Sequence, residues 1–176
     1  MTKEEIISQL KLVSEKFISD CAAIPSELFF FQPGDKWSIA QNVTHLATSA
    51  KMTKLAYALP KFMIRLYAGR PNRPSKNFEE LVSKYKMKLE QGGKASGRFI
   101  PKMISQENGK DNILQQFENG MKDLSSSIQK KWTDPQLDQY IAPHPLLGKI
   151  TLRELGYFTI YHTKHHNDII LERLKS

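Results

Sequence analysis

Apolar positions recur at steps of three and four along most of this chain, a spacing that predicts amphipathic helices. One helix is expected over residues 3–20 and another over residues 112–131. Their apolar sides consist of Ile6, Leu10, Val13 and Phe17 in the first helix, and of Ile113, Phe117, Met121, Leu124 and Ile128 in the second. Strand signals are scarce by comparison, so the pattern indicates a mainly helical protein.

Two four-residue segments mark the starts of two further helices. "SIAQ" at 38–41 and "TLRE" at 151–154 fit a capping box, in which a Ser or Thr side chain and a Gln or Glu side chain three residues later bond each other's backbone N–H groups. The helix after Ser38 is expected to run to about Ala58, and the one after Thr151 to about Leu174. With the first two, these helices predict an all-α four-helix bundle.

The remaining segments are shorter. A single domain over residues 1–176 is expected, because no linker or internal repeat divides the chain. Its connections are predicted as a loop at 27–37, a helix at 61–67, a basic amphipathic helix at 78–90, a flexible loop at 92–101 and a long connection at 133–150. The helices at 61–67 and 78–90 form an excursion between the bundle helices.

Composition is typical of a soluble globular protein, with 40% hydrophobic and 25% charged residues. No apolar run approaches the roughly 20 residues of a membrane-spanning helix, and the first residues read as a helix and not as a signal peptide. The one cysteine, Cys21, cannot form an internal disulfide and is expected to be a small buried hydrophobe. A cytoplasmic location is therefore expected.

Positive charge is concentrated in one region. Residues 60–102 contain eleven Lys or Arg and three Glu, which accounts for the whole net charge of +8. Such a region could attract an anionic substrate, nucleic acid or a membrane surface, or could be a solvated helix and its loops. Arg65, Arg70, Arg73 and Arg98 are candidate anion-binding groups within it.

Three of the five histidines lie in the segment "YHTKHHNDII" at 161–170. Since helix residues are rotated by about 100° each, His162 and His166 fall on one side of the last helix and His165 on its flank. The same side carries Leu152, Leu155, Thr159, Ile169 and Arg173. A bundle buries such a stripe, and two buried imidazoles need partners, which could be a metal ion or hydrogen bonds within the core.

Two other histidines could complete a metal site. His144 is flanked by prolines in "APHPLLGK" and is expected to have a structural role in a loop. His45 lies in the helix after Ser38, away from its apolar stripe of Ile39, Val43, Leu46 and Ala50. Its side could line a polar groove or face solvent, and spacing leaves both options open.

The segments "KWSIAQNVTHLATSAKMT" (36–53) and "HPLLGKITLRELGYFTIYHTKHHNDI" (144–169) together resemble the DinB/YfiT-like family of four-helix-bundle metalloenzymes. The shared features are a Trp-Ser entry to a helix that carries a histidine followed by Leu, a Leu-Gly-x-x-Thr helix start, and H-x-x-x-H. The resemblance covers nearly the whole chain. It implies that His45, His162 and His166 bind a divalent metal, with His165 beside the site.

The resemblance also implies a chemistry. Similar proteins include enzymes that transfer low-molecular-weight thiols such as bacillithiol or mycothiol onto electrophiles, so a thiol transferase or a hydrolase that activates water is expected. Zinc or nickel is the expected ion, with iron or manganese as further options. Gln41, Thr48 and Thr159 could orient a ligand or a bound water, whereas the sequence assigns no general base.

Two readings without catalysis compete with the enzymatic one. In one, the basic region 60–102 contacts nucleic acid, although it lacks interleaved exposed aromatic residues and no helix-turn-helix pattern is evident. In the other, the chain is a purely structural or interaction bundle, and a homodimer would be compatible with such a fold. A bound metal ion whose binding requires the histidines would favour the enzymatic interpretation over the two non-catalytic ones.

Overall fold

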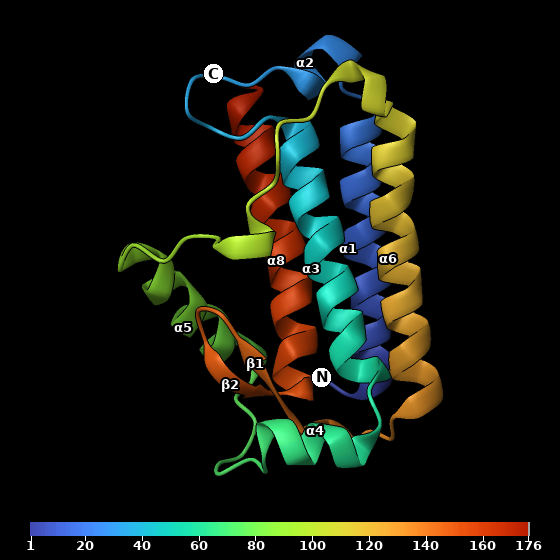
Figure 1. Cartoon of the computed structure of the whole chain (residues 1–176), viewed down its shortest axis with the longest axis vertical. Helices are drawn as coiled ribbons and strands as arrows, with labels where there is room; N and C mark the ends of the chain where they lie inside the picture. Colours follow the sequence, from blue (N-terminus) through green and yellow to red (C-terminus); the bar gives the residue numbers. More distant parts are fainter. Residues whose placement is uncertain (176) are drawn as a thin grey trace.

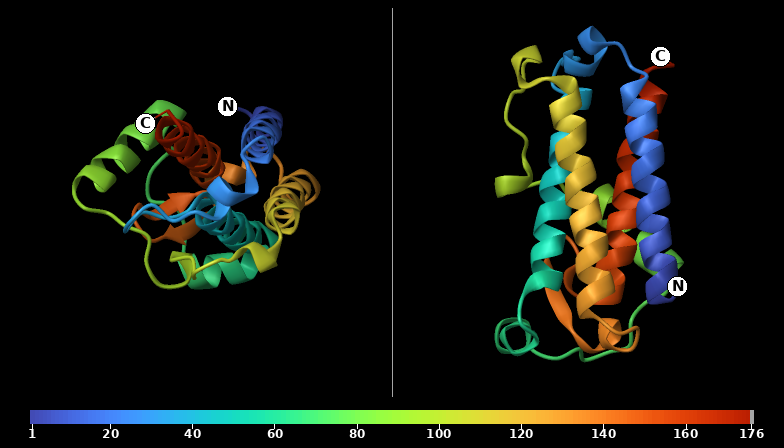
Figure 2. Two further views of the ribbon diagram at one scale, coloured as in Figure 1. Left: turned by 90° about the horizontal axis from the view of Figure 1, so that it is seen from above. Right: turned by 90° about the vertical axis from the view of Figure 1, so that its right-hand side faces the viewer.

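Four long helices form the body of the protein in the computed structural model, which describes residues 1–175 (Figure 1). They are α1 (Lys3–Ala22), α3 (Ile39–Ala58), α6 (Lys110–Lys131) and α8 (Leu152–Arg173). Figure 2 shows them side by side around one axis. The predicted all-α four-helix bundle is therefore confirmed. No helix in the described part of the chain is long and apolar enough to cross a lipid bilayer.

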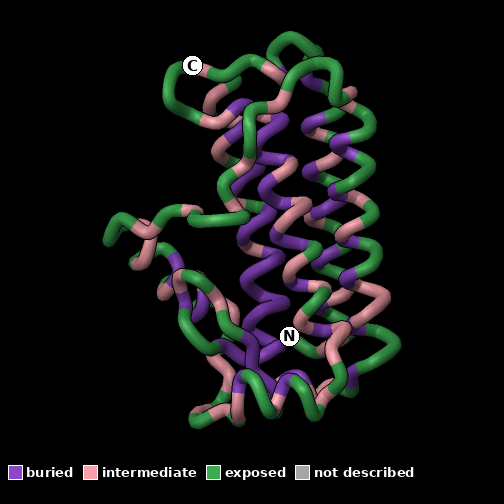
Figure 3. Tube along the Cα trace, in the orientation of Figure 1, coloured by how far each residue is buried: buried purple, intermediate pink, exposed green. Residues whose placement is uncertain are grey.

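The predicted apolar sides of the long helices meet in the core. Phe17 of α1 packs edge-on against Phe117 of α6, with 5.0 Å between ring centroids, and Leu10 and Leu124 are fully buried nearby in the same cluster. Figure 3 shows buried positions along the inner sides of the helices and along most of α8. Cys21 is buried as expected, and burial raises its thiol pKa to about 12.

Both predicted capping boxes are present. The Ser38 hydroxyl accepts the backbone N–H of Gln41, and the Gln41 side chain accepts the backbone N–H of Ser38. Thr151 and Glu154 make the same pair of bonds at the start of α8. These caps fix where the two helices begin, which matters because the histidines of interest lie on these two helices.

The basic excursion lies between α3 and α6. It contains α4 (Lys61–Ala68), α5 (Phe78–Glu90) and two short 3₁₀ turns, η1 (Gly97–Phe99) and η2 (Gln106–Asn108). In Figure 1, α4 crosses the end of the bundle where α8 begins, and α5 lies outside α8. Tyr85 of α5 packs edge-on against Phe158 of α8, with ring centroids 5.2 Å apart. The excursion therefore covers the outer side of α8, and residues 152–160 are buried all around that helix.

Two predicted connections contain structure that the sequence pattern did not reveal. The loop expected at 27–37 begins with a short helix, α2 (Ser26–Phe30). The connection expected at 133–150 contains α7 (Gln136–Gln139) and an antiparallel hairpin of β1 (Ile141–His144) and β2 (Gly148–Thr151), in which Ile141 pairs with Thr151 and His144 with Gly148. Strands of four residues are too short to show a period, and Pro143 obscures the pattern further, although it occupies an exposed position where a proline is tolerated in a sheet.

Candidate metal centre

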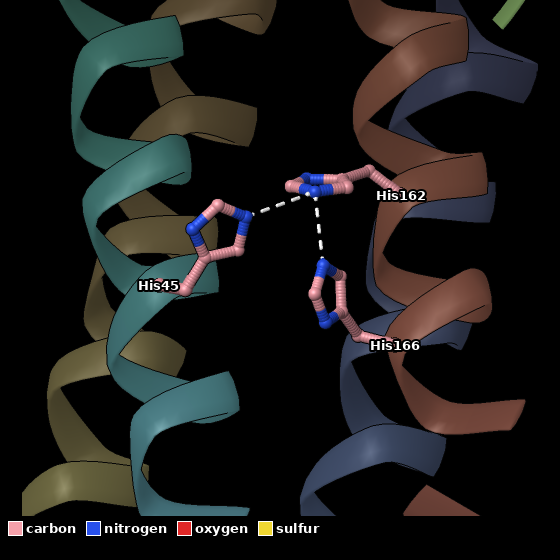
Figure 4. A group of neighbouring side chains, drawn as sticks. All are labelled: His45, His162 and His166. Atoms are coloured by element: carbon pink, nitrogen blue, oxygen red, sulfur yellow. Dashed lines mark hydrogen bonds between the residues drawn. The ribbon is translucent and has the colours of Figure 1, made fainter. Parts of the chain in front are cut away.

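Three imidazoles from two helices converge inside the bundle (Figure 4). His45 comes from α3, and His162 and His166 come from successive turns of α8. The Nε2 atom of His162 lies 3.1 Å from the Nε2 atom of His45 and 3.1 Å from that of His166. All three residues are buried. The structure thus brings together the three histidines that the resemblance selected, and it resolves the direction of His45 in favour of the groove.

The outer nitrogens of two rings are held by carbonyl oxygens. His45 Nδ1 lies 2.7 Å from the backbone oxygen of Phe99, and His166 Nδ1 lies 2.7 Å from Asn42 Oδ1. The Asn42 amide is itself oriented, because its Nδ2 donates to the Ser38 carbonyl at 2.8 Å. Since a carbonyl oxygen can only accept, both Nδ1 atoms carry the proton, and both Nε2 atoms present a lone pair toward His162.

With both Nδ1 atoms protonated, the buried Nε2 atoms offer more hydrogen-bond acceptors than donors. His162 Nε2 has at most one hydrogen, whereas two Nε2 lone pairs face it at 3.1 Å. Without a cation, at least one buried acceptor lacks a donor, which costs stability. Nitrogens that bind one zinc ion at 2.0–2.1 Å with tetrahedral angles lie about 3.3 Å apart, close to the observed spacing. The donor set and its geometry therefore fit a divalent metal ion.

Burial keeps these imidazoles neutral. It lowers the pKa of His162 and of His166 well below the usual value, and the neighbouring histidines lower both further. Burial also lowers the pKa of His45, partly offset by the Phe99 carbonyl. Neutral imidazole is the form that binds metal, so at neutral pH the three side chains are in that form.

Aromatic rings enclose the cluster. The Trp37 ring is parallel to that of His166, with centroids 6.4 Å apart, and lies 5.0 Å from that of His45. Phe158 stacks on His162 at 4.7 Å. Trp37, which precedes the N-cap of α3, therefore covers two of the three candidate ligands.

A cavity of about 740 Å³ opens from the histidines. Its walls come from α3 and α8 of the bundle, from α4 and α5 of the excursion, from the 93–99 segment and from the hairpin. Most lining side chains are apolar, among them Leu59, Ile64, Leu89 and Leu146, and no Asp or Glu lines the cavity within the described residues. Such a mostly apolar pocket of this size suits a small organic molecule.

The three residues expected to orient the candidate ligands, Gln41, Thr48 and Thr159, make no hydrogen bond to them among the described residues. Gln41 caps α3 and donates to the Lys102 carbonyl, and the Thr159 hydroxyl donates to the Leu155 carbonyl. The residue that does orient a candidate ligand, Asn42, was missed. Its position three residues before His45, on the same side of the helix, was the available signal, and nothing in the sequence showed that His166 would reach it.

Other candidates occupy different surroundings. His165 is half-buried beside the site, with its ring centroid 5.6 Å from that of His166, as the resemblance implied. Asp168 and Glu172, the acidic residues that follow the histidines on α8, are exposed. The Tyr57 hydroxyl donates to the Leu152 carbonyl within the core, so Tyr57 is not a pocket residue that could act on a substrate.

The four candidate arginines do not form one anion site. Arg73 makes a two-pronged ion pair with the buried Glu154, at 2.7 and 3.0 Å, and Arg65 lies over the Tyr140 ring at 4.7 Å. Of the four, Arg98 alone lines the cavity among the described residues. Arg73 is occupied by Glu154 and not by an external anion, because the buried Glu154 carboxylate needs a positive partner.

Comparison with known proteins gives one finding on family. The family model of the DinB superfamily matches residues 9–170 of the chain. This stretch contains all four bundle helices except the start of α1 and the end of α8. Comparisons with curated proteins and with solved structures gave no significant match.

Proposed function

We propose that this chain, which belongs to the DinB superfamily, holds one divalent metal ion on His45, His162 and His166 and uses it to activate a small nucleophile. One observation carries the proposal: the Nδ1–H groups of His45 and His166 donate to carbonyl oxygens, which leaves their buried Nε2 lone pairs facing the Nε2 atom of His162. A divalent cation would be a suitable partner for these lone pairs.

The ligand set indicates a catalytic role for such an ion. Three neutral imidazoles leave its charge uncompensated and at least one coordination position open, as in catalytic zinc sites and unlike closed structural ones. When bound, the ion would lower the pKa of a low-molecular-weight thiol or of water, so that a nucleophile forms at neutral pH. Zinc or nickel suits three imidazoles best, and iron or manganese is the further option.

The protein's own groups would supply orientation and a dry environment. Asn42 and the Phe99 carbonyl hold two imidazoles in the ligating tautomer. Trp37 and Phe158 cover the rings and limit the access of water. The apolar cavity beside the histidines would hold the carbon skeleton of an electrophile next to the activated thiol or water. The proposed reaction is therefore transfer of a thiol to an electrophile, or hydrolysis.

The test is metal analysis of the protein purified without chelator. We expect close to one divalent ion per chain, lost in His162→Ala, with His165→Ala as the matched control because His165 is a neighbouring imidazole that is not a proposed ligand. A screen of thiols and electrophiles with and without the ion would then separate the two nucleophiles, because a thiol transferase gives a thioether and a hydrolase does not. Metal-free wild-type protein that does not take up zinc or nickel would contradict the proposal.

A further inference from the structure

His144 is a histidine that the metal centre does not use. It ends β1 and lies in the wall of the cavity, where its ring packs edge-on against Phe158, with centroids 4.2 Å apart. Phe158 in turn stacks on His162. Phe158 therefore contacts both His144 and the candidate metal ligand His162. His144 lies in the part of the cavity that would hold the body of a bound organic molecule.

The hairpin turn determines which nitrogen of His144 carries the proton. The backbone N–H groups of Leu146 and Leu147 donate to His144 Nδ1 at 3.2 and 3.1 Å. A nitrogen that accepts two N–H groups cannot carry a hydrogen, so the proton of the neutral ring is on Nε2. This Nε2–H has no hydrogen-bond partner among residues 1–175.

The ring also remains neutral. Burial, with a smaller contribution from the nearby Lys84 ammonium, lowers the pKa of His144 to about 4. Lys84 is held in place because it donates to the Leu147 carbonyl at 3.0 Å. At neutral pH the side chain is a fixed, uncharged hydrogen-bond donor. No Asp or Glu, which would favour a cationic ligand, lines the cavity within the described residues.

We propose that the cavity binds an apolar molecule that carries a neutral acceptor oxygen, such as a carbonyl, and that His144 selects it by donating its Nε2–H to that oxygen. His144 is a specificity-determining residue in this account, because it contacts the ligand and not the metal. The inference deepens the proposed function, since the substrate of the metal centre would occupy the same cavity. Binding at His144 does not need the ion, so the two proposals can fail separately.

The experiment uses two probes of nearly the same shape, 2-acetylnaphthalene and 2-isopropenylnaphthalene, which differ by a carbonyl oxygen in place of a methylene group. Their dissociation constants are measured by equilibrium dialysis on chelator-treated protein. The dissociation constant of the hydrocarbon divided by that of the ketone is then compared between variants. In His144→Asn the amide oxygen can still accept the Leu146 and Leu147 N–H groups, while the amide ends short of the Nε2 position.

We expect this ratio to fall about fivefold in His144→Asn, the effect of one neutral hydrogen bond, while the hydrocarbon binds as in wild type. His144→Phe, which keeps a ring against Phe158 but has no donor, should lower the ratio equally. The matched control His165→Asn, at another imidazole of the cavity wall, should leave it unchanged. An unchanged ratio in either His144 variant, or no binding of either probe to wild type, would overturn the proposal.

Discussion

His166 donates its Nδ1–H to Asn42 Oδ1 over 2.7 Å, and this bond joins α8 to α3 one turn before His45. The same helix therefore supplies one candidate ligand and orients another. Because the Asn42 amide nitrogen is bonded to the Ser38 carbonyl, the N-terminal cap of α3 also determines which way the amide points.

Replacement of Asn42 should weaken metal binding without removing a ligand. In Asn42→Ala, His166 loses the acceptor that fixes its tautomer, and we expect affinity to fall about 10- to 100-fold, the usual effect of such outer partners. Competition with a chromophoric chelator measures the change. Asn42→Asp keeps an acceptor oxygen and should stay within a few fold of wild type. Equal affinity for wild type and the Ala variant would show that the bond does not orient the ligand.

Metal should stabilise the fold, because the candidate ligands come from two helices that are far apart in the chain. An ion that binds only the folded state adds about 2.7 kcal/mol to the free energy of unfolding at a concentration 100 times its dissociation constant. Thermal unfolding with and without zinc measures this shift. The His45→Ala variant should show little response, since its remaining ligands lie on α8 alone. An equal shift in that variant would place the ion elsewhere.

The bundle and its caps could be predicted because each bundle helix carries its own local signal. The apolar period of Ile6, Leu10 and Phe17 is contained in one segment, and Ser38 and Gln41 are neighbours within one turn. His162 and His166 could likewise be placed inward from the stripe of one helix. For these residues the tertiary structure agrees with what the local sequence favours.

The rest depended on contacts between distant segments. The direction of His45 and the role of Asn42 become clear only when α3 lies against α8, and the Phe99 carbonyl reaches His45 from a loop 54 residues away in sequence. Arg73 was a candidate anion-binding group, and its actual partner, Glu154, could not be foreseen because it is 81 residues away in sequence. Periodicity and capping patterns contain no information about such pairs.

The ion pair of Arg73 and Glu154 should make stability depend on pH. Burial alone would raise the pKa of Glu154, but Arg73 and the backbone N–H groups of Lys76 and Thr151 outweigh burial and lower it. A lowered folded-state pKa contributes stability above the unfolded value of about 4.3, and this contribution is lost as pH falls through the folded value.

Glu154→Gln should therefore be less stable than wild type at pH 7, and the difference should shrink as the pH falls below the unfolded value and through the lowered folded pKa of Glu154. We expect a difference of about 2 kcal/mol at pH 7, less than for a fully buried pair because 33% of the Arg73 side chain is exposed. Urea unfolding at several pH values measures it. A difference that is constant with pH would mean that the charge of Glu154 does not contribute.

Replacement by alanine at two helical glycines should change the free energy of unfolding in opposite directions. A Cβ at Gly156 would lie 2.9 Å from Ile6 Cγ2 and 3.3 Å from the Tyr57 hydroxyl, both fully buried, whereas a Cβ at Gly120 would lie an ordinary 3.5 Å from Ala50 Cβ. Gly156→Ala should lower the free energy of unfolding by about 1 kcal/mol, since overpacking exceeds the gain in helix propensity. Gly120→Ala should raise it by up to about 1 kcal/mol. Chemical denaturation of both variants checks the signs, and a stabilised Gly156→Ala protein would contradict the close approach of α1.

The candidate ligands lie on two bundle helices, whereas much of the cavity wall is built by the excursion and the hairpin. Changes in residues 60–102 can therefore reshape the cavity while the three imidazoles keep their positions. A chain organised in this way allows the histidine cluster and the cavity beside it to diversify separately. It suggests grafting a different excursion between α3 and α6 as a route to engineered variants that bind new ligands.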